Sequence, residues 1–438
     1  MSGLVLPTME QIRWADCELG VIIHYDLEVF TRESIFDYWE HKVEIPPVEE
    51  LKNVFTPDRL DVDQWVRSAA EIGAKYSVLV AKHCTGFCLW PTEQHDYSIK
   101  STSYKDGKGD LVREFIDACE KYGLEPGLYY SAARNQYKNA YDPGLVRGGT
   151  PEDQQAYNDM IIGQLTELWT WYGKVFEIWF DGGCLPPEQG GPDIAGLLKK
   201  LQPDALVFQG PEGTKSLLRW VGNERGVADE ECSSIVQFEA QSFDGLSETM
   251  NRGDTHGNVW CPAECDLPNR DCERGWLGGW FWREEDDDTV LSGEHLFETY
   301  LQSVGRGCNM LLGMPIDKHG LFPETDLLQF RRFARLKDEA FSAVLAEGTA
   351  RDENTFLLTV PDGKTAKYAV VAEDIAQGER ILAYRLTGCN AQGTEVFRKE
   401  GCLIGHKRIF RLEGDIRTLT FEVTSSKCTP VIRTFCVC

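Results

Sequence analysis

Short apolar runs alternate with amphipathic stretches along the first three quarters of the chain. The runs are rich in β-branched and aromatic residues, and their length is that of buried strands rather than of helices. In chain order they are GVIIHY (20–25), YSVLVAKH (76–83), GLYYS (127–131), EIWFD (177–181), ALVFQG (205–210), RWVGNE (219–224), NVWCPAE (258–264) and CNMLLGMP (308–315).

Several of the intervening stretches have the periodicity of helices. In DLVREFIDACEKYG (110–123) the apolar residues fall on one face, Asp110 precedes them as a cap, and Gly123 follows them as a stop. The segment DVDQWVRSAAEIGAKY (61–76) repeats this design. Strand, helix and strand at such spacing predict βαβ units around a parallel sheet.

About eight strands over roughly 340 residues favour an α/β fold of the (β/α)₈ TIM-like barrel type. An open doubly wound sheet is the structural alternative. Such sheets usually carry a glycine-rich phosphate loop, and the sequence contains none.

The pattern changes after about residue 345, where short alternating segments are separated by turn signals such as PDG and NAQG. This predicts a small antiparallel β-sandwich. We therefore expect a barrel domain at 1–344 and a sandwich domain at 345–438, the second either structural or shaping one side of a cleft.

Charge and composition limit the partners and the cellular compartment that can be expected. The net charge of −25 and the pI near 4.8 argue against nucleic acid or an anionic membrane as a partner. No stretch approaches the 18 apolar residues of a spanning helix, and the N-terminal MSGLVLPTMEQIRW lacks a signal-peptide pattern. Fifteen scattered cysteines suit a reducing compartment, so a cytoplasmic location is expected.

Metal and serine-nucleophile chemistry find little support. There are eight histidines, no HExxH pair and no GxSxG elbow. Cys261, Cys265 and Cys272 lie close together, but without the spacing of a usual zinc site. We expect neither a metal nor another cofactor.

Polar side chains gather at the carboxyl ends of the predicted strands, which is where barrel active sites form. Taken singly, each of these residues has a structural explanation. Asp181 with Gly182 could form a turn, and a histidine after a strand is often structural. Of the adjacent Tyr129 and Tyr130, at most one faces a pocket. Together they predict a ring around a pocket, because so many polar groups would be costly as core. They are His24, His83, Tyr129, Tyr130, Asp181, Glu224 and Glu264.

At this point the chain resembles a known family, the family-29 glycoside hydrolases, which are retaining α-L-fucosidases. The resemblance covers most of the first 340 residues and rests on long co-linear segments. They are GVIIHY, KHCTGFCLWPTEQHDYSI (82–99), ACEKYGLEPGLYYS (118–131), EIWFDGG (177–183), RWVGNERGVA (219–228), WCPAECD (260–266) and SVGRGCNMLLGMPIDKHGL (303–321).

The resemblance implies the catalytic pair. The WFDG segment carries the family nucleophile, here Asp181, and WVGNE looks like the segment that supplies the acid/base in the branch cleaving α-1,3/1,4-linked fucose, here Glu224. Retaining glycosidases need two such carboxyl groups about 5 to 5.5 Å apart. Glu264 is the rival acid.

The resemblance also implies the sugar contacts. Trp280 or Phe281 would wall the methyl group of fucose, and Trp39 is a weaker candidate. The chain departs from many relatives at Cys84-Thr85, where they have His-Asp, so a ring nitrogen and a carboxylate are missing from this loop. The full substrate-binding set is His24, Trp39, His83, Tyr130, Trp179, Glu264, Trp280 and Phe281.

The resulting expectation is an exo-α-L-fucosidase that removes α-1,3- or α-1,4-linked fucose from branched, Lewis-type glycans, its only implied partner being that substrate. A glycosidase for a related sugar such as α-L-galactose is one alternative. A catalytically decayed fucose-binding protein is another, although the presence of both Asp181 and Glu224 argues against decay. A purely structural barrel is the third.

Overall fold

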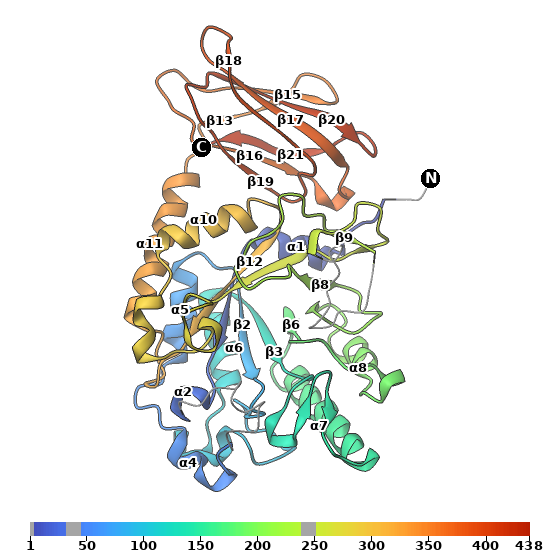
Figure 1. Ribbon diagram of the computed structural model, residues 1–438, viewed down its shortest axis with the longest axis vertical. Coiled ribbons are helices and arrows are strands. Elements are labelled where there is room, and N and C mark those ends of the chain that lie inside the picture. Colours follow the sequence, from blue (N-terminus) through green and yellow to red (C-terminus); the bar gives the residue numbers. More distant parts are fainter. Residues whose placement is uncertain (1–3, 32–44, 238–250) are drawn as a thin grey trace.

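The computed structural model describes residues 4–31, 45–237 and 251–438, and it places a barrel below a pair of stacked sheets (Figure 1). Eight strands close the barrel, and every neighbouring pair among them is parallel, as the sequence predicted. Around the barrel their order is β1 (Leu19–His24), β12 (Asn309–Pro315), β11 (Ala263–Leu267), β8 (Leu217–Trp220), β7 (Leu206–Phe208), β6 (Glu177–Trp179), β3 (Glu125–Tyr130) and β2 (Tyr76–Lys82).

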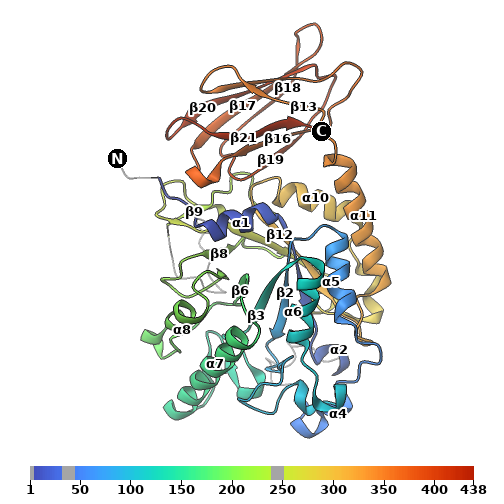
Figure 2. The ribbon, with the colours of Figure 1, turned by 180° about the vertical axis from the view of Figure 1, so that it is seen from behind.

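Helices cover the outside of the barrel (Figures 1 and 2). They are α5 (Val62–Glu71), α6 (Leu111–Tyr122), α7 (Pro151–Trp171), α8 (Ile194–Leu201), α10 (Gly293–Ser303) and α11 (Glu324–Phe341). α1 (Met9–Cys17) lies at the end of the barrel that faces the stacked sheets, and α2 (Glu28–Thr31) and α4 (Leu51–Val54) lie at the opposite end. The helical layer is interrupted between β7 and β8, where residues 209–216 form only a loop. No helix among the described residues has the length and apolar character to cross a membrane.

The predicted helix boundaries follow from side-chain caps. Asp110 accepts a hydrogen bond from the backbone N–H of Arg113 at 2.9 Å and so starts α6. Gly123 ends it with φ of +71°, a left-handed conformation that glycine adopts without strain. Asp61 caps α5 in the same way through the N–H of Gln64.

The seventh predicted strand is wrong in position. Residues 258–264 do not form one strand: β10 (Val259–Trp260) pairs antiparallel with β9 (Ile235–Val236), and the barrel strand β11 begins only after Pro262. The proline has no N–H to donate to a ladder, so the apolar run is split there. Glu264 is consequently the second residue of β11 and not the last residue of a strand.

Glu264 lies inside the barrel in a buried polar cluster. Its carboxylate accepts hydrogen bonds from Tyr76 Oη at 2.6 Å and from Trp179 Nε1 at 2.9 Å. It also hydrogen-bonds to Glu177, whose pKa is raised well above its usual range by burial and by Glu264. Trp14 of α1 donates a hydrogen bond to Glu177 from the end of the barrel that faces the sandwich. The two carboxyl groups therefore share a proton beneath the barrel mouth.

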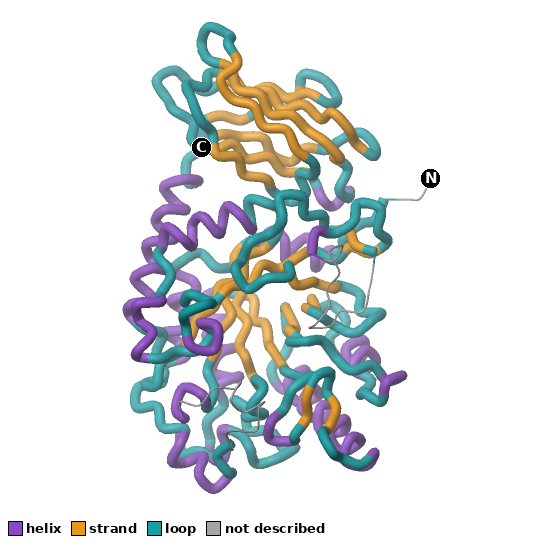
Figure 3. Tube along the Cα trace, in the orientation of Figure 1, coloured by secondary structure: helices purple, strands orange, loops and turns teal. Residues whose placement is uncertain are grey.

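The C-terminal part forms two antiparallel sheets (Figure 3). One contains β13 (Ala346–Glu347), β21 (Ile432–Val437), β16 (Tyr368–Glu373) and β19 (Arg408–Arg411). The other contains β14 (Thr349–Ala350), β15 (Thr355–Thr359), β20 (Thr418–Ser426), β17 (Ile381–Cys389) and β18 (Glu395–Gly401). Their inner faces enclose a separate hydrophobic core, as expected of a sandwich.

The sandwich joins the barrel near the amino-terminal ends of its strands. His406 lies 2.8 Å from Asp16, just before β1, and the N–H of Ile409 donates to the carbonyl of Gly305, just before β12. Glu379 also accepts hydrogen bonds from Ser233 and Ser234 of a barrel loop. A pocket opens at the other end of the barrel, at the carboxyl ends of its strands.

Candidate active site

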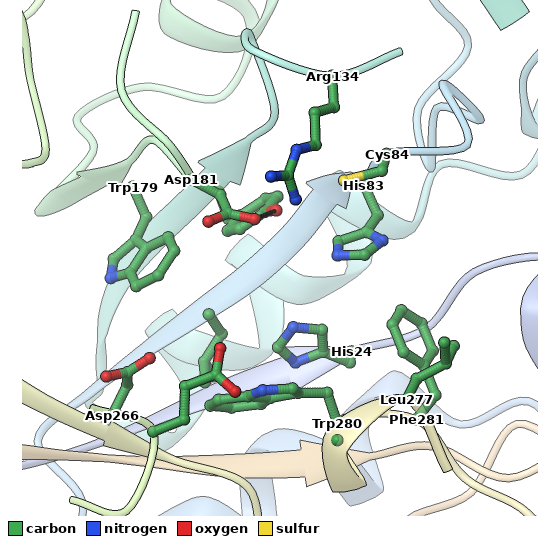
Figure 4. Close-up of a pocket in the computed structure, with 14 residues that line it drawn as sticks. His24, His83, Cys84, Arg134, Trp179, Asp181, Asp266, Leu277, Trp280 and Phe281 are labelled. Carbon is green, nitrogen blue, oxygen red and sulfur yellow. Dashed lines mark hydrogen bonds between the residues drawn. The ribbon is translucent and has the colours of Figure 1, made fainter. Parts of the chain in front are cut away.

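A cavity of about 170 Å³ lies at the carboxyl ends of the barrel strands, and Figure 4 shows its walls. All of its lining residues lie between positions 22 and 281, so the sandwich contributes none of them. They are Ile22, His24, His83, Cys84, Tyr129, Arg134, Trp179, Asp181, Glu224, Asp266, Leu277, Gly278, Trp280 and Phe281.

Asp181 lies two residues beyond the end of β6 and lines the cavity. Gly182 and Gly183 turn the chain away with φ of +74° and +77°, a conformation that other residues adopt only with strain. Tyr129 Oη donates a hydrogen bond to Asp181 Oδ2 at 2.9 Å. The guanidinium of Arg134 points toward the same carboxylate (Figure 4), and the two interact electrostatically. A phenol donor and a cation thus lie beside the Asp181 carboxylate.

Glu224 comes from the loop after β8 and lines the same cavity. Burial raises the pKa of its carboxyl group above the ordinary value, a hydrogen bond with Trp280 opposes the rise, and the negative charge of Asp181 adds to it. The pocket therefore holds one carboxyl group surrounded by hydrogen-bond donors and another that is disposed to keep a proton.

His24 and His83 lie side by side on the rim, with ring centroids 5.9 Å apart. Burial lowers the pKa of each imidazole, and for His24 the neighbouring His83 lowers it further. Both rings are thus neutral near pH 7. They can exchange hydrogen bonds with hydroxyl groups without bringing positive charge into the pocket.

Aromatic rings form most of the remaining wall. Trp280 and Phe281 lie 5.0 and 5.4 Å from the ring of His24, and Trp179 stacks on Phe208 at 3.8 Å. The indole N–H of Trp179 is already donated to Glu264, so this side chain offers the pocket its apolar face.

Two predicted sugar contacts are placed elsewhere. Tyr130 faces outward from β3, because successive strand residues point to opposite sides, and its hydroxyl donates to Gln164 of α7 at 2.7 Å. Glu264 is fully buried below the cavity. Neither Tyr130 nor Glu264 lines the pocket, so both predictions are wrong. Tyr129 lines the pocket where Tyr130 was expected, and Asp266 lines it where Glu264 was expected. Trp39 lies outside the described residues.

The sequence analysis missed Asp266 and Arg134. Asp266 lines the pocket and accepts a hydrogen bond from Trp220 Nε1 at 2.7 Å. Burial, and secondarily Glu224, raises its pKa well above the usual range. Strand alternation from Glu264 would have found it, had β11 been recognised beyond Pro262. Arg134 lies on a loop, pairs with Asp142, and has no periodic signal.

Within residues 4–31, 45–237 and 251–438, two groups of side chains have the donor types of a metal site. His83, Cys84 and Asp181 form one, and Asp26, Glu28 and His83 form the other; within each, the donor atoms lie within 4.8 Å of one another. The positive charge of Arg134 beside Asp181 opposes a cation in the first group. In the second group, both oxygens of Asp26 already accept hydrogen bonds, from the N–H of Leu27 and from the Thr85 hydroxyl.

Comparison with known proteins places this pocket in context. The family model described as alpha-L-fucosidase matches residues 10–335. Alpha-L-fucosidase 1 of Arabidopsis thaliana is 29% identical, covering 98% of this chain and 86% of its own. A glycoside hydrolase 29 family member from an unknown rumen bacterium is 30% identical, with a TM-score of 0.80, and covers 99% of this chain and 77% of its own.

A crystal structure from Bacteroides thetaiotaomicron VPI-5482 has a TM-score of 0.91 at 30% identity, and the match covers 99% of both chains. The family model spans the whole barrel, including every strand that carries a pocket residue. The chain therefore belongs to the α-L-fucosidase family and is a glycoside hydrolase that acts on α-L-fucosides.

Proposed function

We propose that this α-L-fucosidase is a retaining exo-enzyme in which Asp181 is the nucleophile and Glu224 the acid/base. One observation carries the proposal. Two of the carboxyl groups that line one small cavity lie in opposite surroundings: Asp181 is beside a phenol donor and a guanidinium, and Glu224 is buried so that its pKa rises. Environments that push two carboxyl groups apart in pKa are what acid and nucleophile roles require.

In the first step, Asp181 attacks the anomeric carbon of the bound fucose. Glu224 gives its proton to the glycosidic oxygen as the bond to the leaving sugar breaks, so that the aglycone departs as a neutral alcohol. The product of this step is a fucosyl ester of Asp181 with the anomeric configuration inverted. The Tyr129 hydroxyl holds the second oxygen of the carboxylate and limits its rotation.

In the second step, Glu224 is ionised and takes a proton from water. The water oxygen attacks the anomeric carbon and the ester bond to Asp181 breaks, which inverts the configuration again and releases α-L-fucose. The first-formed anomer is therefore the same as that of the substrate.

Cavity size and wall chemistry support an exo mode on fucose. A volume of about 170 Å³ is below the 300–1,000 Å³ of pockets for drug-sized ligands, so it suits one terminal sugar ring. Leu277, Trp280 and Phe281 give it an apolar side that fits a 6-methyl group better than the 6-hydroxyl of α-L-galactose. The preference for α-1,3- and α-1,4-linkages on Lewis-type glycans rests on the resemblance of the WVGNE and PAECD segments.

Fucose release from 3-fucosyl-lactose and 2′-fucosyl-lactose tests the linkage. We expect kcat/KM for the 3-linked sugar to exceed that for the 2′-linked sugar by at least about 100-fold, a difference of about 2.7 kcal/mol in transition-state binding. Comparable rates on both would keep the fucosidase and remove the linkage preference. Release of galactose from an aryl α-L-galactoside at the rate of the fucoside would favour the alternative sugar.

Tyr129→Phe tests the support of the nucleophile. We expect kcat on an aryl α-L-fucoside to fall about 10- to 100-fold, because a hydrogen bond to an ionised group is worth about 1.5–3 kcal/mol. The neighbouring Tyr130→Phe is the matched control. It loses an equally buried hydroxyl, which bonds to Gln164 behind the barrel wall. Equal losses of kcat in the two variants would contradict a role for Tyr129 at Asp181.

A further inference from the structure

Two buried acids, Asp26 and Glu28, follow β1 and lie behind His83 without lining the pocket. Asp26 Oδ2 accepts a hydrogen bond from Thr85 Oγ1 at 2.6 Å, and its Oδ1 accepts one from the N–H of Leu27 at 2.6 Å. One carboxyl oxygen of Glu28 lies within 4.8 Å of one carboxyl oxygen of Asp26 and of a ring nitrogen of His83. As whole residues, Asp26 and Glu28 are 2% and 3% exposed, so water competes little for these contacts.

This cluster reaches the pocket through His83. Glu28 Oε1 lies 3.6 Å from His83 Nδ1, slightly beyond hydrogen-bond distance. Contacts of this kind are often long in a free enzyme and shorten when substrate binds. An Nδ1 that carries its proton toward Glu28 leaves Nε2, on the far side of the ring, as an acceptor for a sugar hydroxyl.

The loop from His83 to Phe87 has Thr85 where many relatives have aspartate, so it brings no carboxylate of its own. The structure supplies one from a different strand, because Asp26 is held on the Thr85 hydroxyl. The carboxylate that the loop lacks in sequence is thus replaced by one that lies beside the loop in space.

We propose that Asp26 and Glu28 form a buried carboxyl pair, anchored by Thr85, that positions His83 to bind fucose. Both acids are positioning residues, since neither lines the cavity. The proposal rests on the proposed function, because it requires His83 to contact the sugar.

Other charged groups face this pair and bear on its titration. Among the described residues, His83 and Lys82 interact electrostatically with Asp26, and Cys84 does so with Glu28. His24, Arg134 and Asp181 act on His83 instead. Burial raises the pKa of Asp26 well above its usual range and that of Glu28 to about 7. Between pH 6 and 8 the pair therefore gains negative charge at Glu28, while His83, with its lowered pKa, stays neutral.

The test is the inhibition constant of free L-fucose, measured by competition with an aryl α-L-fucoside. In the wild type, ionisation of Glu28 strengthens its hold on His83, so the fucose Ki should fall as the pH rises from 6 to 8. In Glu28→Gln we expect Ki about 3- to 10-fold higher at pH 8, with the ratio of mutant to wild-type Ki shrinking toward pH 6. A ratio that is independent of pH would overturn the proposal.

A carboxyl group introduced at position 85 should restore the fucose binding that is lost when the carboxyl group of Asp26 is removed. Asp26→Asn should raise Ki several-fold, and adding Thr85→Asp to it should recover Ki to within about threefold of wild type. Thr85→Asp alone should weaken binding, because a third carboxyl group would enter the pair. If the double variant binds fucose no better than Asp26→Asn, the carboxyl pair does not act through this contact and the proposal is wrong.

Thr85→Val and Thr102→Val separate positioning from stability. Thr102 is also buried and donates its hydroxyl to Ile99 at 2.7 Å, but it lies away from the pocket. We expect both variants to lose some thermal stability and only Thr85→Val to raise the fucose Ki. Equal Ki values in the two would overturn the proposal. A wild type that binds no fucose would instead overturn the proposed function, and with it the premise about His83.

Discussion

Asp181→Ala is expected to lower the rate of fucose release on the order of 10³- to 10⁵-fold, the loss typical of removing a covalent nucleophile. The reason is geometric. No other carboxylate in the pocket follows β6, and the Tyr129 hydroxyl and the Arg134 guanidinium are both directed at this one. The measurement is kcat on an aryl α-L-fucoside, with the fold checked by thermal unfolding.

Azide distinguishes a nucleophile from a merely structural acid. In Asp181→Ala the anion can enter the space left by the carboxylate, attack the anomeric carbon and displace the aglycone in a single inversion. The expected product is β-L-fucosyl azide, accompanied by partial recovery of rate. Asp204→Ala, which removes a largely exposed acid that pairs with Lys215, is the control and should keep full activity. Substantial residual activity in Asp181→Ala without azide would contradict the assignment.

The fold was predictable because its signals are local and repeated. Continuous apolar strands and capped amphipathic helices recur along the barrel, and period-two alternation marks the sandwich. The prediction failed where two short elements share one apolar run. The register of β11 depends on Pro262 and on pairing with β8 and β12. The apolar run alone does not reveal how it pairs with segments that are distant in the sequence.

The site was predictable where a residue ends a strand. His24 is the last residue of β1, and His83 and Asp181 follow β2 and β6 closely, so all three reach the pocket. The sequence could not show which of Tyr129 and Tyr130 points into the barrel. Successive side chains of β3 point to opposite sides, and strand pairing decides which set faces inward. Arg134 could not be found at all, because a loop residue is placed by tertiary contacts, here its ion pair with Asp142.

Glu264 illustrates how burial changes the meaning of a carboxyl group. From the sequence it was a rim residue and the rival of Glu224. In the structure its two oxygens are occupied by Tyr76 and Trp179, and its remaining interaction is the proton shared with Glu177. The residue that competes with Glu224 for the acid role is therefore Asp266, whose pKa burial also raises and which does line the pocket.

Glu224→Ala should accordingly lower kcat/KM on fucosyl-lactose about 10²- to 10⁴-fold, the usual range for a general acid. The loss on an aryl fucoside with a good leaving group should be smaller in the first step, because a phenolate needs little help to depart. Azide should here attack the fucosyl ester of Asp181, so that two inversions give α-L-fucosyl azide. Formation of the β-azide instead would contradict the assignment.

The pH profile decides between Glu224 and Asp266. A general acid must be protonated, so activity is present below its pKa and is lost as the pH rises through it; burial raises the pKa of Glu224 and moves that loss to higher pH than for an exposed glutamate. Glu224→Gln should abolish this alkaline limb of kcat/KM, whereas Asp266→Asn should keep it with a changed midpoint, because one charge near Glu224 is gone. The reverse pattern would make Asp266 the proton donor.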